Sequence, residues 1–366
     1  MRAIGLMSGT SFDGVDVALV ETNGERIEAF GPSGYRPYMA AERRVLSQAL
    51  SDAVAIERRT ERPGAVAEAE AVVTAAHAEA VERFLREHHI DVDGVDVVGF
   101  HGQTVLHRPE AGLTVQIGDG PALARRLGLP VVYDFRAADV AAGGQGAPLA
   151  PTIHPVLLRG LDLPRPLAVL NLGGVGNVTF IGADGELVAF DTGPANALMD
   201  DRLMRETGEA FDRDGAIAAS GTVDETALAR LMDDAYFDVA PPKSLDRNAF
   251  SAGPTEALPL ADALATLAAF TVETVVRAAA HLPKPPVLWI VAGGGARNPT
   301  LLDLLRRRLG ADVRTADAVG LSADALEAQA FAVLAVRSLR GLPLTYPGTT
   351  AAPRPLTGGV LARPDA

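Results

Sequence analysis

The chain has 366 residues, a length typical of about two domains. Its 33 Lys and Arg residues are outnumbered by 46 Asp and Glu residues, and the net charge of −13 opposes binding to nucleic acid or to an anionic membrane. Cys is absent, which excludes disulfides, thiolate nucleophiles and Cys-ligated zinc. The first residues lack a secretory signal pattern and no apolar run approaches the ~18 residues of a membrane span, so a cytoplasmic protein is expected.

Two predicted hairpins with polar or glycine-rich turns open the two halves of the chain. An apolar run at 3–7 is followed by a polar turn and a second run at 15–20. The same order returns at 167–172 and 177–181, again with a glycine-rich turn between the runs. The repeated form predicts two similar domains.

Helical spacing of aliphatic residues predicts Ala-rich helices at 66–88, 258–282 and 322–339. Strands and helices alternate along most of the chain, so the fold class is α/β. The segment 137–155 is rich in Gly and Pro and is a candidate crossing between the domains. The proline-rich segment after Gly341 is expected to be loop.

The first turn carries residue types that bind phosphate. It runs Gly9-Thr10-Ser11-Phe12-Asp13-Gly14-Val15-Asp16. Amides and hydroxyls of such a turn can surround phosphate oxygens, and a carboxylate in it can hold Mg²⁺ through water. An ordinary hairpin turn explains the same residues, because Asp-Gly is a favoured turn pair, and both interpretations stay open. The sequence contains neither a Walker loop nor the dinucleotide-binding glycine fingerprint, so ATP would be bound in another way.

A glycine cluster in the second half has a different context. The apolar run 286–292 leads into Gly293, Gly294 and Gly295, and a helix is predicted after Asn298. Asn298 suits the N-cap position of that helix, with Pro299 at its first position. A strand, a glycine turn and a helix N-terminus together form a common nucleotide site.

Asp191 follows the apolar run 187–190 and precedes Gly193 and Pro194. A carboxylate held at a strand end by a rigid turn is well placed to act as a general base. Asp and Thr are also good helix caps, and a helical pattern follows. The local sequence favours neither interpretation.

Further polar residues follow strand-like runs, where sites of α/β proteins are built. They include His101, Gln103 and Arg136, although a single His is more often structural than catalytic. Glu327 shares a helical stripe with Phe331 and so lies among apolar side chains. It is either a solvated edge residue, the commoner case, or a buried ligand group.

In their order, these motifs resemble the anhydro-N-acetylmuramic acid kinase family. The resemblance covers about residues 5 to 350. The matching segments are 5–16, 101–104, 116–120, 134–136, 143–149, 171–174, 191–194 and 293–298.

The resemblance implies a two-domain fold like that of hexokinase, actin and the heat-shock chaperone ATPases, with a mixed sheet in each domain and ATP in the cleft between them. Domain I would comprise 1–136, with the tail 341–366 packed back on it, and domain II would comprise 137–340. The implied reaction opens the 1,6-anhydro ring of anhydro-N-acetylmuramic acid with water and phosphorylates O6, during peptidoglycan recycling. The resemblance also implies a homodimer.

The resemblance assigns roles to individual residues. ATP phosphates would be bound by Gly9, Thr10, Ser11, Phe12, Asp13, Gly14, Val15 and Asp16, and by Gly173 and Gly174. Asp13 would hold Mg²⁺ through water. Gly293, Gly294, Gly295 and Asn298 would border the adenosine. Asp191 would be the general base, and the sugar pocket would include His101, Gln103, Arg136 and Glu327.

The chain departs from the common family pattern at three places. Gly176 replaces Ala, Ala195 replaces Gly, and 245–248 replaces Thr-Gly-Arg-Glu, which puts sugar contacts there in doubt. Two other functions are compatible with parts of the sequence: a non-catalytic, chaperone-like ATP-binding protein, and a glycoside hydrolase with paired carboxylates.

Overall fold

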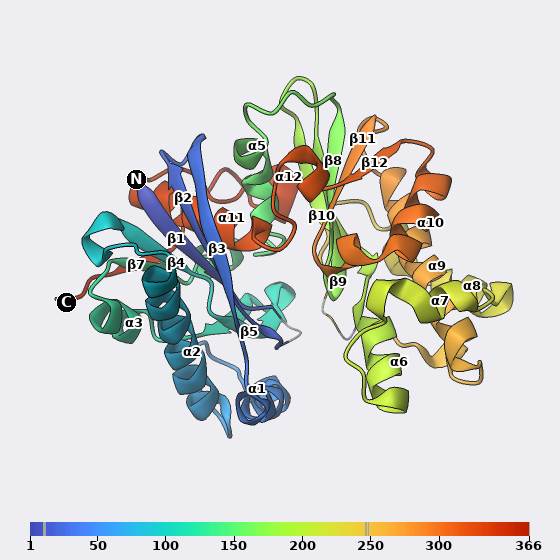
Figure 1. Ribbon diagram of the computed structural model, residues 1–366, viewed down its shortest axis with the longest axis horizontal. Coiled ribbons are helices and arrows are strands. Elements are labelled where there is room, and N and C mark those ends of the chain that lie inside the picture. The colour runs from blue at the N-terminus through green and yellow to red at the C-terminus, as the bar shows by residue number, and fades with distance from the viewer. Residues whose placement is uncertain (10–11, 246, 248, 366) are drawn as a thin grey trace. The chain divides into compact units, whose positions relative to one another are not determined.

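The computed structural model describes residues 1–9, 12–245, 247 and 249–365 (Figure 1). The predicted phosphate-binding residues Thr10 and Ser11 lie outside the described residues, and so do two positions of the segment 245–248. The chain divides into two compact units. Unit 1 comprises Met1–Gly160 and Ala325–Ala366, and unit 2 comprises Leu161–Asp324.

Unit 1 is built around a six-stranded mixed sheet with the order β13-β7-β4-β1-β2-β3. β1, β2 and β3 are consecutive antiparallel strands, β1, β4 and β7 are parallel, and β13 returns antiparallel to β7. β5 and β6 form a separate hairpin. The strands are β1 (Arg2–Met7), β2 (Gly14–Thr22), β3 (Ile27–Pro37), β4 (Val97–Phe100), β5 (Gln103–Arg108), β6 (Leu113–Ile117), β7 (Val131–Tyr133) and β13 (Val360–Ala362).

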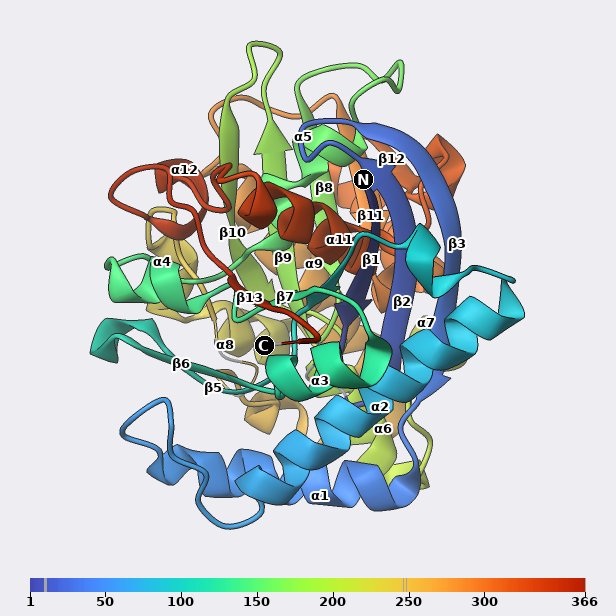
Figure 2. The ribbon, with the colours of Figure 1, turned by 90° about the vertical axis from the view of Figure 1, so that its left-hand side faces the viewer.

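Large aliphatic and aromatic side chains form the core on one face of this sheet. Leu6 and Val17 belong to the same buried cluster as Val73 and Phe84 of α2. Figure 2 shows α1 and α2 side by side at this part of unit 1. The helices of unit 1 are α1 (Ala40–Asp52), α2 (Val66–Glu87), α3 (Gly120–Leu127), α4 (Ala137–Ala141), α5 (His154–Leu157), α11 (Leu326–Leu339) and α12 (Pro347–Thr350).

Small residues occupy the contact between the same sheet and α11. A Cβ added to Gly5 would lie 1.8 Å from the carbonyl oxygen of Ala328, and one added to Gly99 would lie 2.2 Å from that of Phe331. Ala18 packs against Ala328 in the same layer. Because the strands lack side chains at Gly5 and Gly99, the helix backbone lies directly against the sheet.

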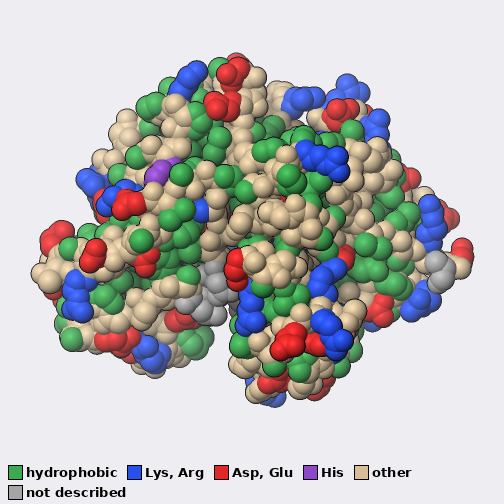
Figure 3. Space-filling view, turned by 180° about the vertical axis from the view of Figure 1, so that it is seen from behind, with side chains coloured by type: hydrophobic (Ala, Val, Ile, Leu, Met, Phe, Trp, Pro, Cys, Tyr) green, Lys and Arg blue, Asp and Glu red, His purple; other side chains and the backbone are tan. Residues whose placement is uncertain are grey.

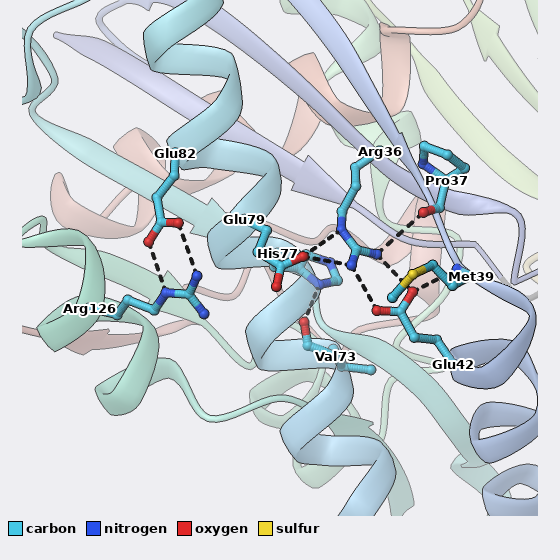
Figure 4. A network of polar contacts seen from close by, with 9 residues as sticks. All are labelled: Arg36, Pro37, Met39, Glu42, Val73, His77, Glu79, Glu82 and Arg126. Carbon is cyan, nitrogen blue, oxygen red and sulfur yellow. Dashed lines mark hydrogen bonds and ion pairs between the residues drawn. The ribbon is translucent and has the colours of Figure 1, made fainter.

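Arg36 connects β3 to the two helices that cover the core (Figure 4). Its guanidinium donates to both carboxylate oxygens of Glu42 on α1, at 2.9 and 2.7 Å, and twice to Glu79 on α2, at 3.1 and 2.7 Å. The Arg36 side chain is only 9% exposed. Its hydrogen bonds lower the pKa of Glu42. Glu82 and Arg126 form a second, more exposed ion pair between α2 and α3.

Unit 2 contains a five-stranded mixed sheet with the order β10-β9-β8-β11-β12. Its strands are β8 (Leu167–Leu172), β9 (Val175–Ile181), β10 (Leu187–Pro194), β11 (Leu288–Ala292) and β12 (Asp312–Thr315). Its helices are α6 (Ala197–Thr207), α7 (Ala216–Ser220), α8 (Glu225–Met232), α9 (Leu260–Ala279) and α10 (Pro299–Leu309). The buried helix α9 contacts β9 and β10.

The two sheets share one topology. The order β3-β2-β1-β4-β7 of unit 1 matches β10-β9-β8-β11-β12 of unit 2. In both, the first three strands are antiparallel and the fourth and fifth run parallel to the first. This shared topology confirms the predicted fold class, an α/β protein with a mixed sheet in each of two similar units.

The units differ from the predicted domains 1–136 and 137–340. Residues 137–160 and 325–340 belong to unit 1. The contacts of Gly5 and Gly99 with α11 explain why residues 325–340 belong to unit 1. The segment after Gly341, expected to be loop, contains the short helix α12 and the strand β13.

Among the described residues, no helix has both the length and the apolar character needed to cross a membrane. On the face shown in Figure 3, acidic and basic side chains are interspersed.

Candidate active site

The turn between β1 and β2 presents the Asp13 carboxylate to solvent. Phe12 has a φ of 54°, and its N–H donates to the carbonyl of Gly9 at 3.3 Å, so the turn is tight. The side chains of Phe12 and Val15 are buried in the core. These two residues can therefore offer only backbone groups to a ligand, whereas Asp13 can offer its carboxylate, one oxygen of which accepts from the N–H of Gly14 at 2.9 Å.

Gly14 and Asp16 lie in β2, at the start of the strand that leaves the turn. A Cβ on Gly14 would lie 2.4 Å from the carbonyl oxygen of Arg36 and 2.6 Å from the ring of Tyr35. The absence of a side chain at Gly14 thus permits the close pairing with β3. Asp16 is half-buried and pairs with Tyr35 in the ladder.

The buried side chain of Gln103 is hydrogen-bonded to Ser8 and Gly9, where this turn begins. Its carboxamide oxygen accepts from the Ser8 hydroxyl at 2.5 Å, and its amide nitrogen donates to the carbonyl of Gly9 at 3.1 Å. Ser8 lies 3.1 Å from the buried hydroxyl of Tyr38, whose pKa burial raises to about 12. Gln103 is fully buried, and both ends of its carboxamide are engaged. Its geometry suits holding the turn in place.

His101 and Arg136 form a buried pair. The Nδ1 of His101 lies 2.9 Å from the carbonyl oxygen of Gly102, and its Nε2 accepts from Arg136 Nε at 3.2 Å. Burial, followed by the Arg136 charge, holds the pKa of His101 well below its usual value, so the ring is neutral. Arg136 also donates to the carbonyl of Gly146 at 2.7 Å. With both ring nitrogens engaged, His101 orients the guanidinium.

Glu327 lies in the first turn of α11 and is half-buried. Burial raises the pKa of Glu327, the charge of Arg136 lowers it, and the charge of Asp13 raises it. These three groups therefore interact electrostatically within unit 1. Asp13 lies in the first turn, Arg136 at the N-cap of α4 and Glu327 in α11.

Two further residues, Asp139 and Thr350, fix the loop that Arg136 contacts. The buried carboxylate of Asp139 accepts from the N–H of Gly146 at 2.6 Å and from the hydroxyl of Thr350 at 2.8 Å. The carbonyl of Thr350 in turn accepts from the N–H of Gln145 at 2.5 Å. The loop 143–146 is thereby fixed to α4 and α12. No local pattern signals this, because Asp139 and Thr350 are 211 positions apart.

Asp191 lies inside β10, where the pairing with β9 shifts register between Asp191 and Gly193. Its side chain is 7% exposed. One carboxylate oxygen accepts from the N–H of Leu245 at 2.8 Å. Helix α6 begins later, with Asn196 at its N-cap. The alternative of Asp191 as a helix cap is therefore wrong, because the carboxylate is hydrogen-bonded to the 243–245 segment.

The two glycine turns of unit 2 lie against each other. Gly293 has a φ of 75°, and a Cβ on it would lie 2.4 Å from Asn171 Oδ1. Asn196 donates from its side chain to Leu172 and from its backbone to Gly173, both at 2.9 Å. The end of β8, the turn 173–174 and the turn 293–295 thus lie together, and the side chains of Asn171, Leu172 and Asn196 approach the second turn. The glycines themselves lack side chains, which permits close approach of a ligand to their backbone groups where they are exposed.

Asn298 is the N-cap of α10, as predicted. Its side-chain oxygen accepts from the N–H of Leu301 at 3.2 Å, and Pro299 occupies the first helical turn. Its cap function explains the residue without a ligand.

Within the described residues, no group of three or more His, Asp or Glu side chains could bind a metal ion. The exposed Asp13 fits a Mg²⁺ ion held through water and through phosphate oxygens, a mode that needs few protein ligands. The side-chain-free glycine turns of unit 2 fit a nucleotide.

Comparison with protein families matches residues 1–363 to the model of anhydro-N-acetylmuramic acid kinase. The chain belongs to the anhydro-N-acetylmuramic acid kinase family. Relatives of this name in Bradyrhizobium diazoefficiens and Rhodopseudomonas palustris are 56% and 57% identical, and the alignments cover 100% of this chain and of both relatives.

Solved structures show more distant likenesses. The activator of the 2-hydroxyisocaproyl-CoA dehydratase from Clostridium difficile has a TM-score of 0.47 and 11% identity, over 93% of this chain and 96% of that one. A ROK family glucokinase from Streptomyces griseus has a TM-score of 0.39 and 16% identity, over 92% and 99%. These TM-scores are too low to support conclusions about this chain. Its membership of the anhydro-N-acetylmuramic acid kinase family rests on the full-length sequence matches.

Proposed function

We propose that this chain converts 1,6-anhydro-N-acetylmuramic acid, ATP and water into N-acetylmuramic acid 6-phosphate and ADP. Water adds to C1 of the sugar, the C1–O6 bond of the anhydro bridge breaks, and O6 takes the γ-phosphoryl group of ATP. A base accepts the proton of the attacking water. The family membership over nearly the whole chain supports a kinase role in peptidoglycan recycling.

The observation that carries the assignment of a base is the position of Asp191. Its carboxylate is buried at a register shift of β10, and one of its oxygens accepts from the backbone N–H of Leu245 at 2.8 Å. A carboxylate in such a place keeps a fixed orientation, which a general base requires. We assign it the role of general base.

We assign nucleotide binding to the two hairpin turns and to the glycine turn 293–295. Bound ATP would supply the phosphoryl group, and Mg²⁺ would neutralise its phosphate charge. We assign to Asp13 the binding of Mg²⁺ through a water molecule. Sugar recognition is assigned to Arg136 and Glu327, whereas the engaged side chains of His101 and Gln103 position the neighbouring groups.

Incubation of the chain with ATP, Mg²⁺ and the anhydro sugar tests the reaction directly. ADP and sugar 6-phosphate are expected in equal amounts. Release of phosphate from ATP without phosphorylated sugar would favour the chaperone-like alternative, which the family membership does not favour. Opening of the ring without ATP would favour a glycoside hydrolase.

Asp191→Asn tests the base. The Asn side-chain oxygen can still accept from Leu245, so the fold and ATP affinity should persist while kcat falls about 10³-fold. Asp184→Asn is the matched control, since Asp184 is an exposed carboxylate in the turn between β9 and β10. An active Asp191→Asn chain would contradict the assignment.

We also expect a homodimer and a cytoplasmic location, where ATP is supplied. Light scattering of the purified chain tests the first, and fractionation of cells tests the second.

A further inference from the structure

Three hydrogen bonds connect Asp191 to the segment 236–245. The N–H of Asp191 donates to the carbonyl of Lys243 at 3.0 Å, and the N–H of Leu245 donates to the Asp191 carboxylate at 2.8 Å. The hydroxyl of Tyr236 donates to the carbonyl of Asp191 at 2.6 Å. Both the backbone and the carboxylate of the proposed base are therefore fixed by this one segment.

The side chain of Lys243 organises that segment. Its ammonium donates to the carbonyl of Tyr236 at 2.8 Å and lies 3.5 Å from that of Phe237. The same ammonium lies 4.4 Å from the centroid of the Tyr236 ring and 5.8 Å from that of Phe190. Lys243 thus holds both the backbone and the ring of the residue whose hydroxyl reaches Asp191.

Lys243 is an unusual residue for this place. It is 6% exposed, and among the described residues no carboxylate lies within 4.0 Å of its ammonium. Burying a cation without an anionic partner is costly. The chain has 33 basic residues, of which only Lys243 and Lys284 are Lys, so this buried position departs from a strong preference for Arg.

We propose that Lys243 is a positioning residue, whose ammonium fixes Tyr236 and thereby the orientation of Asp191. The inference rests on the proposed function, in which Asp191 is the base. Lysine suits the role because a compact ammonium can donate to adjacent carbonyls and face two aromatic rings at once, which a planar guanidinium does less well.

The position also makes the contact sensitive to pH. Burial lowers the pKa of Lys243 to about 8, and the charge of Asp238 raises it slightly. Asp238 is itself paired with Arg277 of α9 at 2.9 Å. On the other side, His281 Nε2 lies 2.9 Å from the Phe237 carbonyl that the ammonium approaches.

The pKa of the Tyr236 phenol is raised by burial and then by the charge of Asp191, so this group keeps its proton where Lys243 titrates. As pH rises through about 8, the ammonium loses its charge and holds Tyr236 less firmly. The unfolded chain keeps this proton up to about pH 10.4. The contribution of Lys243 to the free energy of unfolding therefore increases over this interval. Loss of the Lys243 proton therefore does not destabilise the folded chain. A fall in kcat above pH 8 is then not explained by unfolding that this group causes.

The presence of two lysines makes a direct measurement simple. The side-chain signals of ¹³C-labelled lysine can be followed by NMR against pH, with the Lys284→Arg chain assigning one of them. We expect the remaining signal to titrate near pH 8, and kcat to decline about tenfold with the same midpoint. A Lys243 signal that titrates near 10.4, as in model peptides, would overturn the inference.

Kinetics of variants separates positioning from plain structure. Lys243→Arg should remove the decline of kcat between pH 7 and 9.5, and Lys284→Arg should leave it in place. Tyr236→Phe keeps the ring but loses the bond to Asp191, so kcat should fall about tenfold while the KM of the sugar stays within about twofold. An unchanged pH profile in a folded Lys243→Arg chain contradicts the inference.

If Lys243→Arg does not fold, Tyr236→Phe decides, because an unchanged kcat in that variant overturns the proposed chain of contacts. A wild-type chain that makes no sugar phosphate contradicts the proposed function. The NMR titration of Lys243 does not test that function. A wild-type chain that is active, with kcat indifferent to the Lys243 titration, contradicts this inference alone.

Discussion

The two units use one strand order but build different turns on it. In unit 1 the first hairpin is connected by residues 8–13, among whose described members Asp13 has an exposed carboxylate. In unit 2 the matching hairpin is connected by Gly173 and Gly174 alone. The longer turn can act through side chains, whereas the short one can act only through its backbone.

The carboxylates differ in the same way. Asp13 is exposed in a turn, and Asp191 is buried within the third strand of its sheet. An exposed carboxylate can exchange water with a metal ion, and a buried one can keep a single orientation. The shared scaffold therefore carries the two carboxylates to which we assign different roles, one in a turn and one within a strand.

The largest expected effect comes from the contact between α11 and the sheet of unit 1, in which the helix backbone lies directly on Gly5 and Gly99. Gly5→Ala places a Cβ within 1.8 Å of a backbone oxygen of α11, and the cost should be about 3 kcal/mol or more, enough to lose soluble protein. Gly173→Ala is the control in unit 2, where the nearest atom would be 3.7 Å away. Its urea midpoint should match that of the wild type.

Asp13→Asn should lower kcat/KM about 100-fold at low Mg²⁺, with much of the loss recovered as Mg²⁺ is raised. Asp191→Asn should show no such recovery. Initial rates over a Mg²⁺ series measure both. Equal recovery in the two variants would remove the distinction drawn between the exposed and the buried carboxylate.

Arg36→Met should destabilise unit 1 by about 2 kcal/mol, because it leaves the largely buried Glu42 without its partner. Arg126→Met breaks an ion pair whose side chains are 40% and 36% exposed, and should cost less than about 1 kcal/mol. Chemical denaturation measures both values.

The Arg36 interaction also has a pH dependence. Since the pKa of Glu42 is lowered in the folded chain, its contribution to stability is complete above the unfolded value and is lost as pH falls through the folded one. Acid titration of stability should be less steep in Arg36→Met, and equal slopes would contradict this role.

The smallest effect is expected in the glycine turn of unit 2. Gly293→Ala introduces a Cβ 2.4 Å from Asn171 and strains a φ of 75°, so the Kd of ATP should rise about tenfold. At Gly294 the nearest atom would be 3.5 Å away, an ordinary contact, and Gly294→Ala should retain the fold. Calorimetric titration with ATP compares the two, and equal affinities would contradict the role of this turn.

Local sequence was sufficient for the elements that depend on local chemistry. The two hairpins, the cap at Asn298 and the helix at 66–88, observed at Val66–Glu87, follow from apolar runs, turn residues and capping preferences. The same holds for the glycine turn after β11.

Contacts between segments that are far apart in the chain were harder to predict. The bounds implied by the resemblance place the helix at 326–339 in the second domain, yet α11 lies against Gly5 and Gly99 of unit 1, more than 200 positions away. The support of Asp191 by Lys243 and Tyr236 was missed for a similar reason, since these residues carry no motif and meet Asp191 only in the folded chain.

The contact between α11 and the first sheet has a consequence for the evolution of substrate preference. Glu327 immediately precedes Ala328, whose carbonyl lies over Gly5. A methyl group gained at that strand position would push the helix outward and carry the acid with it. Because a chain with that methyl group is expected to lose its soluble fold, substitution of Gly5 is closed as a route to altered sugar selectivity, and the proposed sugar ligand Glu327 keeps its place.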